Sequence, residues 1–179
     1  MVTKLRVYFE GDDRLRPGFR QFLSEIAEVA RSKRCYFDLI ATEGTPVQDF
    51  QTALKSHPNA WNVLLLDRED PQEFERRKKA LEGCDPNSIF WMLQIMESWF
   101  LADVDALKAL FGGSLPKGNP NVEEIPKADV LERLKKAANG EFHKVKHGTT
   151  LLELIDPAKV RKAARNCDRM FSVMLAKLS

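Results

Sequence analysis

The sequence contains no long hydrophobic run and no zinc-binding cysteine pattern. Its longest apolar runs are residues 63–66 and 89–93, far shorter than the roughly 18 residues that a membrane-spanning helix needs. The three cysteines are widely spaced, with no CxxC pair or Cys/His cluster, which argues against a zinc site and predicts reduced thiols. We also find no secretory signal at residues 1–11. These absences predict a soluble, cytoplasmic protein without a membrane segment.

Glycine motifs that bind nucleotides are missing too. Neither GxxxxGK(S/T) nor GxGxxG occurs, which argues against a P-loop or dinucleotide-binding domain. A nucleotide-binding or phosphatase domain of related architecture stays an alternative, because a fold does not fix a function.

The charge is small overall but unevenly distributed. The net charge is +2, yet residues 144–179 hold eight Lys/Arg against three acids, whereas the remainder holds 20 against 23. A basic segment on an acidic body is typical of proteins that contact phosphate groups, although a solvated helix face gives the same pattern.

Two kinds of apolar periodicity alternate along the first 111 residues. Short β-prone runs predict strands at residues 4–9, 35–41, 62–66 and 88–95. Helical spacing follows each of them, at residues 17–30, 47–55, 71–81 and 97–111. This alternation predicts an α/β fold in which a mainly parallel sheet is flanked by helices.

A loop rich in proline and glycine at residues 114–127 marks a change in organisation. Helices are expected after it at residues 129–138 and 156–178, with a polar link at 141–148. We therefore predict an α/β core over residues 1–113 and a helical C-terminal extension over residues 114–179, packed on the same domain.

Acidic residues follow two of the predicted strands. The first strand ends at Glu10, and the third ends at Asp67, with Glu69 and Asp70 close behind. Ligands of open parallel sheets bind beyond the carboxyl ends of the strands, and a hard cation such as Mg²⁺ relieves the repulsion between clustered carboxylates. The pattern predicts a divalent-metal site centred on Glu10 and Asp67. Glu69 and Asp70 could instead be N-terminal charges of the helix that starts at Pro71.

Four segments carry a resemblance to known families. Residues 7–11 (VYFEG) and 64–70 (LLLDRED) resemble the toprim pattern, in which one strand ends in Glu and a later strand ends in Asp-x-Asp. Residues 94–103 (QIMESWFLAD) and 144–148 (KVKHG) resemble the domain of unknown function family 4276. The resemblance covers nearly the whole chain.

The resemblance implies a toprim-like Rossmannoid fold and a nuclease dependent on Mg²⁺ (or Mn²⁺). Relatives are thought of as effectors in anti-phage systems, encoded beside an ABC-type ATPase. Carried over to this chain, Glu10 would be the general acid/base and Asp67 the principal metal ligand. The second acid of Asp-x-Asp is Glu69 here, with Asp70 next to it, so either could be the second ligand.

Further candidates surround these acids. Glu97, expected where the fourth strand gives way to a helix, is the candidate third metal ligand, or else a helix N-terminal charge. Lys146 could stabilise charge in the transition state, and His147 could relay a proton; a solvated polar link is the alternative for both. The candidates for phosphate binding are Lys144, Arg14 and Arg16.

The favoured function is therefore a Mg²⁺-dependent phosphodiester-cleaving enzyme acting on nucleic acid. DNA, RNA and small phosphate esters are all substrates that this chemistry allows. The alternative is a non-catalytic toprim-like module that docks on an ATPase partner and uses the acids as a binding surface.

Overall fold

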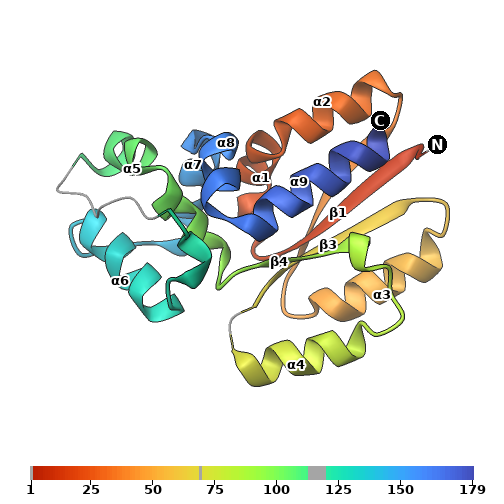
Figure 1. Ribbon diagram of the computed structural model, residues 1–179, viewed down its shortest axis with the longest axis horizontal. Helices are drawn as coiled ribbons and strands as arrows, with labels where there is room; N and C mark the ends of the chain where they lie inside the picture. The colour runs from red at the N-terminus through yellow and green to blue at the C-terminus, as the bar shows by residue number, and fades with distance from the viewer. Residues whose placement is uncertain (1, 69, 113–119) are drawn as a thin grey trace.

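The computed structural model describes residues 2–68, 70–112 and 120–179. Its centre is a parallel four-stranded sheet in the order β2-β1-β3-β4 (Figure 1). The strands are β1 (Lys4–Glu10), β2 (Tyr36–Thr42), β3 (Trp61–Asp67) and β4 (Ile89–Met92). The predicted α/β class, with a parallel sheet flanked by helices, is confirmed.

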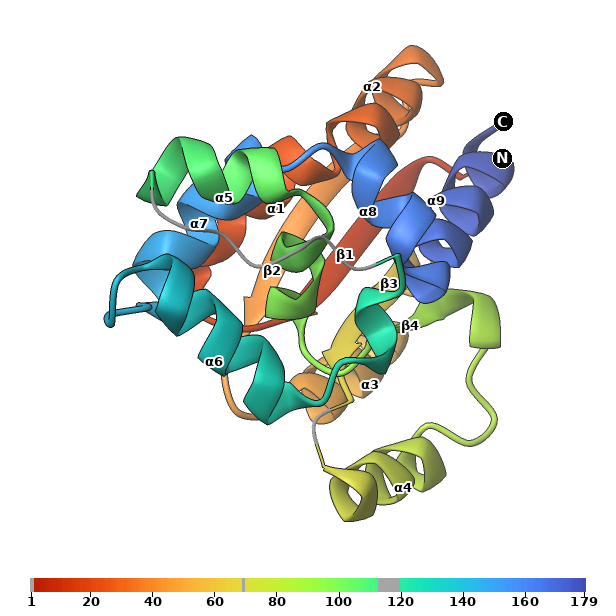
Figure 2. The same cartoon turned by 60° about the vertical axis from the view of Figure 1, so that its left-hand side comes forward.

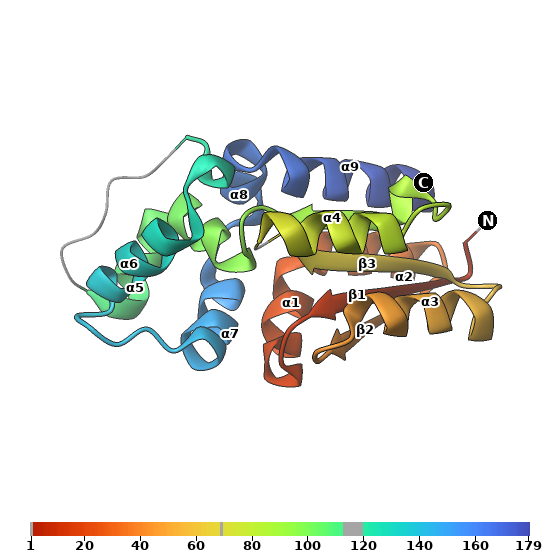
Figure 3. The same cartoon turned by 90° about the horizontal axis from the view of Figure 1, so that it is seen from below.

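Helices cover both faces of the sheet, so the centre of the molecule has three layers (Figures 1 and 3). One face is covered by α1 (Arg16–Phe22), α2 (Ser24–Ser32) and α9 (Arg165–Leu178). The other face is covered by α3 (Pro46–Ser56) and α4 (Pro71–Ala80). Beyond the carboxyl ends of the strands lie α5 (Val104–Phe111), α6 (Lys127–Ala137) and α7 (Lys144–Leu154), with α8 (Pro157–Ala163) leading into α9 (Figure 2). Short 3₁₀ helices are η1 (Asp13–Leu15), η2 (Pro86–Ser88), η3 (Met96–Ala102) and η4 (Val122–Glu124).

The burial of each strand follows from its place in the sheet. In β3, Val63, Leu64, Leu65 and Leu66 are all fully buried, as expected of a central parallel strand covered on both faces. Tyr36 begins β2, which has a neighbour on one side alone, and it is exposed.

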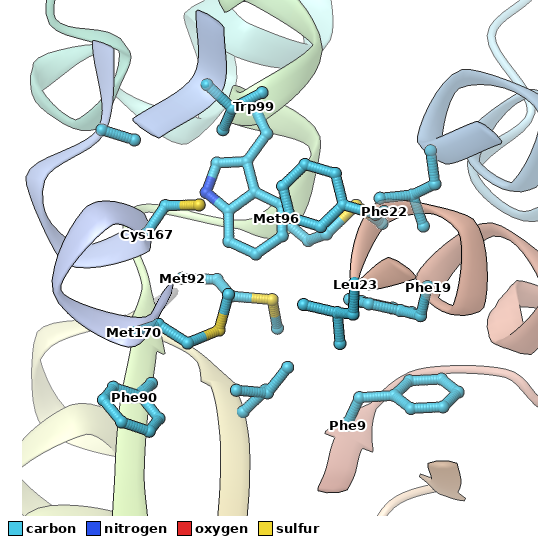
Figure 4. Close-up of a cluster of buried hydrophobic side chains, with 14 of the residues drawn as sticks. Phe9, Phe19, Phe22, Leu23, Phe90, Met92, Met96, Trp99, Cys167 and Met170 are labelled. Carbon is cyan, nitrogen blue, oxygen red and sulfur yellow. The ribbon is translucent and has the colours of Figure 1, made fainter. Parts of the chain in front are cut away.

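The main core joins the N-terminal and C-terminal parts of the chain. Figure 4 shows Phe9, Phe22 and Trp99 in one cluster with Cys167 and Met170 of α9. The rings of Phe22 and Trp99 stack with centroids 5.0 Å apart. Burial of such large apolar groups is the main favourable term in folding, so α9 contributes to the same core as β1.

The connections reverse direction between β1 and β3. From β1 the chain passes through α1 and α2 to β2, on one side of β1; it then crosses through α3 to β3, on the other side. In open α/β sheets this reversal, the topological switch point, is where ligands bind, beyond the carboxyl ends of the strands. Glu10 and Asp67 are the last residues of these two strands.

Three expected helices are interrupted. The helix expected at 17–30 breaks at Leu23, and that at 156–178 breaks at Ala164, which is extended. The segment expected to be helical from 97 is a 3₁₀ helix that ends at Ala102, and the side chain of the next residue, Asp103, caps α5. Apolar periodicity continues across all three breaks because the flanking helices pack on one core, so periodicity alone did not reveal them.

The prediction of a polar link at residues 141–148 was wrong, because helix α7 begins at Lys144. Its Leu151 and Leu152 are fully buried, and α7 packs against α1. The helix contains Gly148 and two threonines, which are weak helix formers. Packing on α1 therefore stabilises this helix more than local propensity does.

All three cysteines are free thiols: Cys35 and Cys167 are buried and Cys84 is half-buried. Over residues 2–68, 70–112 and 120–179, no helix combines the length and the apolar composition needed to span a membrane.

Gly18 allows the close approach of α1 and α7. A Cβ atom at this position would lie 2.7 Å from both Leu152 Cβ and the Thr149 carbonyl oxygen. We expect Gly18→Ala to lower the free energy of unfolding by about 1–3 kcal/mol because the two helices must separate. Urea unfolding measures this change, and Gln21→Ala, at an exposed position on the same helix, should change stability by less than about 0.5 kcal/mol. Equal or higher stability of Gly18→Ala would contradict the packing of α7 on α1.

Candidate functional site

Glu10 reaches across the switch point to the neighbouring strand. Its Oε2 atom accepts a hydrogen bond from the backbone N–H of Asp67 at 3.1 Å. The ends of β1 and β3 are thereby joined through the side chain of Glu10, which contacts the backbone of Asp67 rather than its carboxylate.

Arg77 of α4 binds the same carboxylate. Its Nη1 donates to Glu10 Oε2 at 2.7 Å and its Nη2 to Oε1 at 2.8 Å, a bidentate pair with side-chain exposures of 15% for Arg77 and 21% for Glu10. Nη1 also donates to the Asp67 carbonyl oxygen at 3.3 Å, and Nε donates to Glu73 at 2.8 Å. The hydrogen bonds to Glu10 raise the pKa of Arg77. Two-point pairing of this kind fixes geometry as well as charge.

Asp67 connects the sheet to the segment that follows β4. Its Oδ1 accepts the backbone N–H of Met96, the first residue of η3, at 2.8 Å. Asp67 thus positions the start of the segment that carries Glu97.

Glu97 is a buried acid beside a lysine. It is 4% exposed, which is rare for glutamate unless it is paired. Lys144 Nζ, at the start of α7, lies 3.4 Å from Glu97 Oε1. Glu97 and Lys144 therefore come together from the two parts of the chain, next to the residue that Asp67 binds.

Comparisons with known proteins identify a family and a related fold. The family model described as "Domain of unknown function (DUF4276)" matches residues 12–175. The chain belongs to this family. No curated protein matches the sequence significantly.

One solved structure resembles this DUF4276 chain over its full length. It is the C-terminal region of the Burkholderia pseudomallei OLD protein, with a TM-score of 0.56, 11% identity and coverage of 100% of both chains. At this identity the likeness shows a shared fold alone.

Glu69 and Asp70 are the two candidates for the second metal ligand. Glu69 lies outside the described residues. Asp70 is the N-cap of α4, where its Oδ1 accepts the N–H groups of Gln72 and Glu73 at 2.8 and 3.1 Å. Asp70 therefore has the structural role of a helix cap, and its part in metal binding stays a prediction.

The basic candidates occupy two places. Arg14 of η1 forms an ion pair with Asp12, and Arg16, the first residue of α1, forms one with Asp13. Lys146 is exposed on α7. The roles of these three residues in phosphate binding and catalysis stay predictions.

His147 lies in an aromatic cluster. Its ring contacts Phe111, Phe142 and His143, and its Nδ1 accepts the backbone N–H of His143 at 3.1 Å. Burial, and then the nearby His143 and Lys146, lower the pKa of His147. A proton relay by His147 stays a prediction.

Arg77 is the site residue that sequence reasoning missed. It belongs to the basic run Arg76-Arg77-Lys78-Lys79, which looks like a solvated helix face. The spacing of Glu73 and Arg77 predicts a pair along the helix, but the contact with Glu10 spans 67 residues and leaves no local signal.

The donor chemistry of the strand ends fits a hard divalent cation. Glu10 and Asp67 offer carboxylate oxygens, and Mg²⁺ is usually held by one or two carboxylates together with water and substrate phosphates. Within the described part of the chain, no three His, Cys, Asp or Glu residues lie close enough to form a complete protein cage for a metal. The site therefore fits a cation with few protein ligands, provided that the ion pair between Arg77 and Glu10 opens.

Asp103, six residues after Glu97, is a structural anchor. Its carboxylate accepts Lys159 Nζ at 2.7 Å, the N–H of Asp156 at 2.9 Å and the N–H of Ala106 at 3.4 Å. Burial by itself raises the pKa of Asp103, but the hydrogen bonds from Lys159, Asp156 and Ala106 outweigh it and hold the pKa below its usual value.

Asp103→Asn should reduce stability in a pH-dependent way. Because the pKa is lower in the folded state, the carboxylate stabilises the protein above about pH 4 and loses this effect as the pH falls through the folded-state value. We expect a loss of about 1–3 kcal/mol in the free energy of unfolding at pH 7 and a smaller loss at pH 3, measured by urea unfolding. Asp105→Asn removes an 86%-exposed partner of the same lysine and should cost less than about 1 kcal/mol. An equal loss for Asp103→Asn at both pH values would contradict the assignment.

Proposed function

We propose that this chain is a Mg²⁺-dependent phosphodiester-cleaving enzyme of the toprim type that acts on nucleic acid. The observation that carries the proposal is that β1 and β3 end side by side at the topological switch point in Glu10 and Asp67, where Glu10 Oε2 accepts the backbone N–H of Asp67 at 3.1 Å. Two acids at the position where α/β sheets bind ligands, in a family with a toprim-like strand pattern, support metal-assisted chemistry on a phosphate.

Asp67 and Glu10 would hold the cation, with Asp67 as the principal ligand. A bound divalent cation would neutralise charge on the phosphate oxygens and orient the phosphate. Glu10 is the proposed proton acceptor, at a carboxylate oxygen that faces the end of β3. General-base residues contribute about 10²–10⁴-fold to rate when they lie within reach of the proton.

Lys144 is the stronger of the two lysine candidates for stabilising negative charge. Both lysines are exposed residues of α7, but the ammonium group of Lys144 lies 3.4 Å from the carboxylate of the buried Glu97. Glu97, with the backbone after β4, would position Lys144 beside the phosphate, where a fixed positive charge stabilises the transition state.

The proposal is tested by cleavage of DNA and RNA with Mg²⁺ or Mn²⁺. We expect Asp67→Asn and Glu10→Gln to slow cleavage by about 100-fold or more, and a chelator to abolish it. Glu75→Gln removes an exposed acid of α4 and serves as the matched control, with wild-type activity. Cleavage that survives both chelation and Glu10→Gln would refute the proposal.

A second candidate is a non-catalytic module that docks on an ABC-type ATPase in an anti-phage system. The ion pair of Glu10 with Arg77 favours it, because a neutralised carboxylate can serve structure alone. Calorimetric titration separates the two functions. If the chain is a non-catalytic module, neither the wild type nor Asp67→Asn should bind Mg²⁺ or Mn²⁺. If it is the enzyme, the wild type should bind the metal and Asp67→Asn should bind it much more weakly.

A further inference from the structure

Arg77 holds the carboxylate on which the proposed chemistry depends. A carboxylate offers about four lone-pair positions, and three N–H groups already occupy Glu10: the backbone of Asp67 and two from Arg77. A cation or a proton can use Glu10 fully only after the guanidinium group moves.

A second carboxylate can remain paired with Arg77 when the guanidinium group leaves Glu10. Glu73 lies one turn earlier on α4 and accepts Arg77 Nε at 2.8 Å. Hydrogen bonds from Arg76 and then Arg77 hold the pKa of Glu73 at about 2, so Glu73 stays negative at neutral pH. Arg77 would therefore not be left unpaired.

There is also space beside the guanidinium group. A cavity of about 90 Å³ lies between α3 and α4 and is lined in part by Glu73, Arg76, Arg77 and Val47. It has room for several water molecules, since roughly 10–15 Å³ is enough for one. This is the space that we expect the Arg77 head group to occupy when it leaves Glu10.

From these contacts we infer that Arg77 is the internal counter-cation of the metal site, exchanging with a divalent cation at Glu10. In the metal-free protein Arg77 neutralises Glu10 across the end of β3; when a cation binds at Glu10 and Asp67, Arg77 moves onto Glu73. Two positive groups on one carboxylate repel each other, so the exchange sets the metal concentration at which the site fills. This inference rests on the proposed metal site and adds Arg77 and Glu73 to it as positioning residues.

Calorimetric titration with Mn²⁺ and with Mg²⁺ tests the exchange without any substrate. Arg77→Met keeps much of the length and removes the charge, so we expect it to bind the metal about tenfold more tightly than the wild type. Lys79→Met is the matched control: it removes one positive charge from an exposed position of the same helix and leaves the ion pairs of Glu10 and Glu73 in place, so its metal affinity should stay at the wild-type value. A purely structural role for Arg77 would make Arg77→Met bind more weakly.

Glu73→Gln should act in the opposite direction. Without the second carboxylate, Arg77 has less to hold it away from Glu10, and we expect the metal affinity to fall severalfold below that of the wild type. Circular dichroism in the presence of EDTA checks that each variant is folded. If Arg77→Met is unfolded, the fall in the metal affinity of Glu73→Gln relative to Lys79→Met decides the question.

The outcomes separate this inference from the proposed function. Metal binding by the wild type, with equal or weaker binding by Arg77→Met, overturns the exchange and leaves the proposed metal site standing. Unchanged affinity in Glu73→Gln also overturns the exchange. The absence of binding in the wild type and in every variant overturns the metal site and the exchange together.

Discussion

The carboxylate of Glu10 ties together three elements that are distant along the chain. It leaves the end of β1, accepts the N–H of Asp67 at the end of β3, and pairs with Arg77 of α4. Each of these groups would be costly to leave half-buried without a partner. The local geometry of the switch point, the orientation of α4 and the state of the candidate site therefore depend on one ion pair. Any chemistry that used the Glu10 carboxylate as a ligand or a base would have to rearrange that pair.

The parts of the fold that rest on local patterns were predictable. The uniform apolar run Val63–Leu66 identified a central parallel strand, and the acids that follow β1 and β3 marked the edge of the sheet where ligands bind. The breaks at Leu23 and Ala164 were not predictable, because apolar spacing continues through them. Helix α7 was missed because its stability comes from packing on α1, a contact that no local pattern encodes.

The candidate site likewise contains residues that the sequence indicated and residues that it did not. Glu10 and Asp67 are candidates from their position at strand ends and from the toprim-like pattern, since parallel strands bring their carboxyl ends to one edge. Arg77 was hidden in a basic run typical of an exposed helix face, and its role depends on the angle at which α4 lies against the strand ends. The pairing of Glu97 with Lys144 likewise depends on how α7 packs across η3. Tertiary packing, rather than sequence spacing, sets the charge balance here.

The contact at Gly18 has a consequence for how related sequences can differ. Leu152 of α7 approaches this glycine so closely that even a methyl group would collide with it, and Thr149 Oγ1 donates to the carbonyl oxygen of Arg14 at 2.7 Å. The loop that carries the chain away from Glu10 is thus held by the helix that begins with Lys144. In homologues we expect glycine to be retained at position 18, because the colliding atoms are the Cβ of Leu152 and the backbone oxygen of Thr149, which a smaller side chain at position 152 would leave in place. A glycine retained here would mark, through the family, the contact between the segment after the acidic strand end and the basic helix.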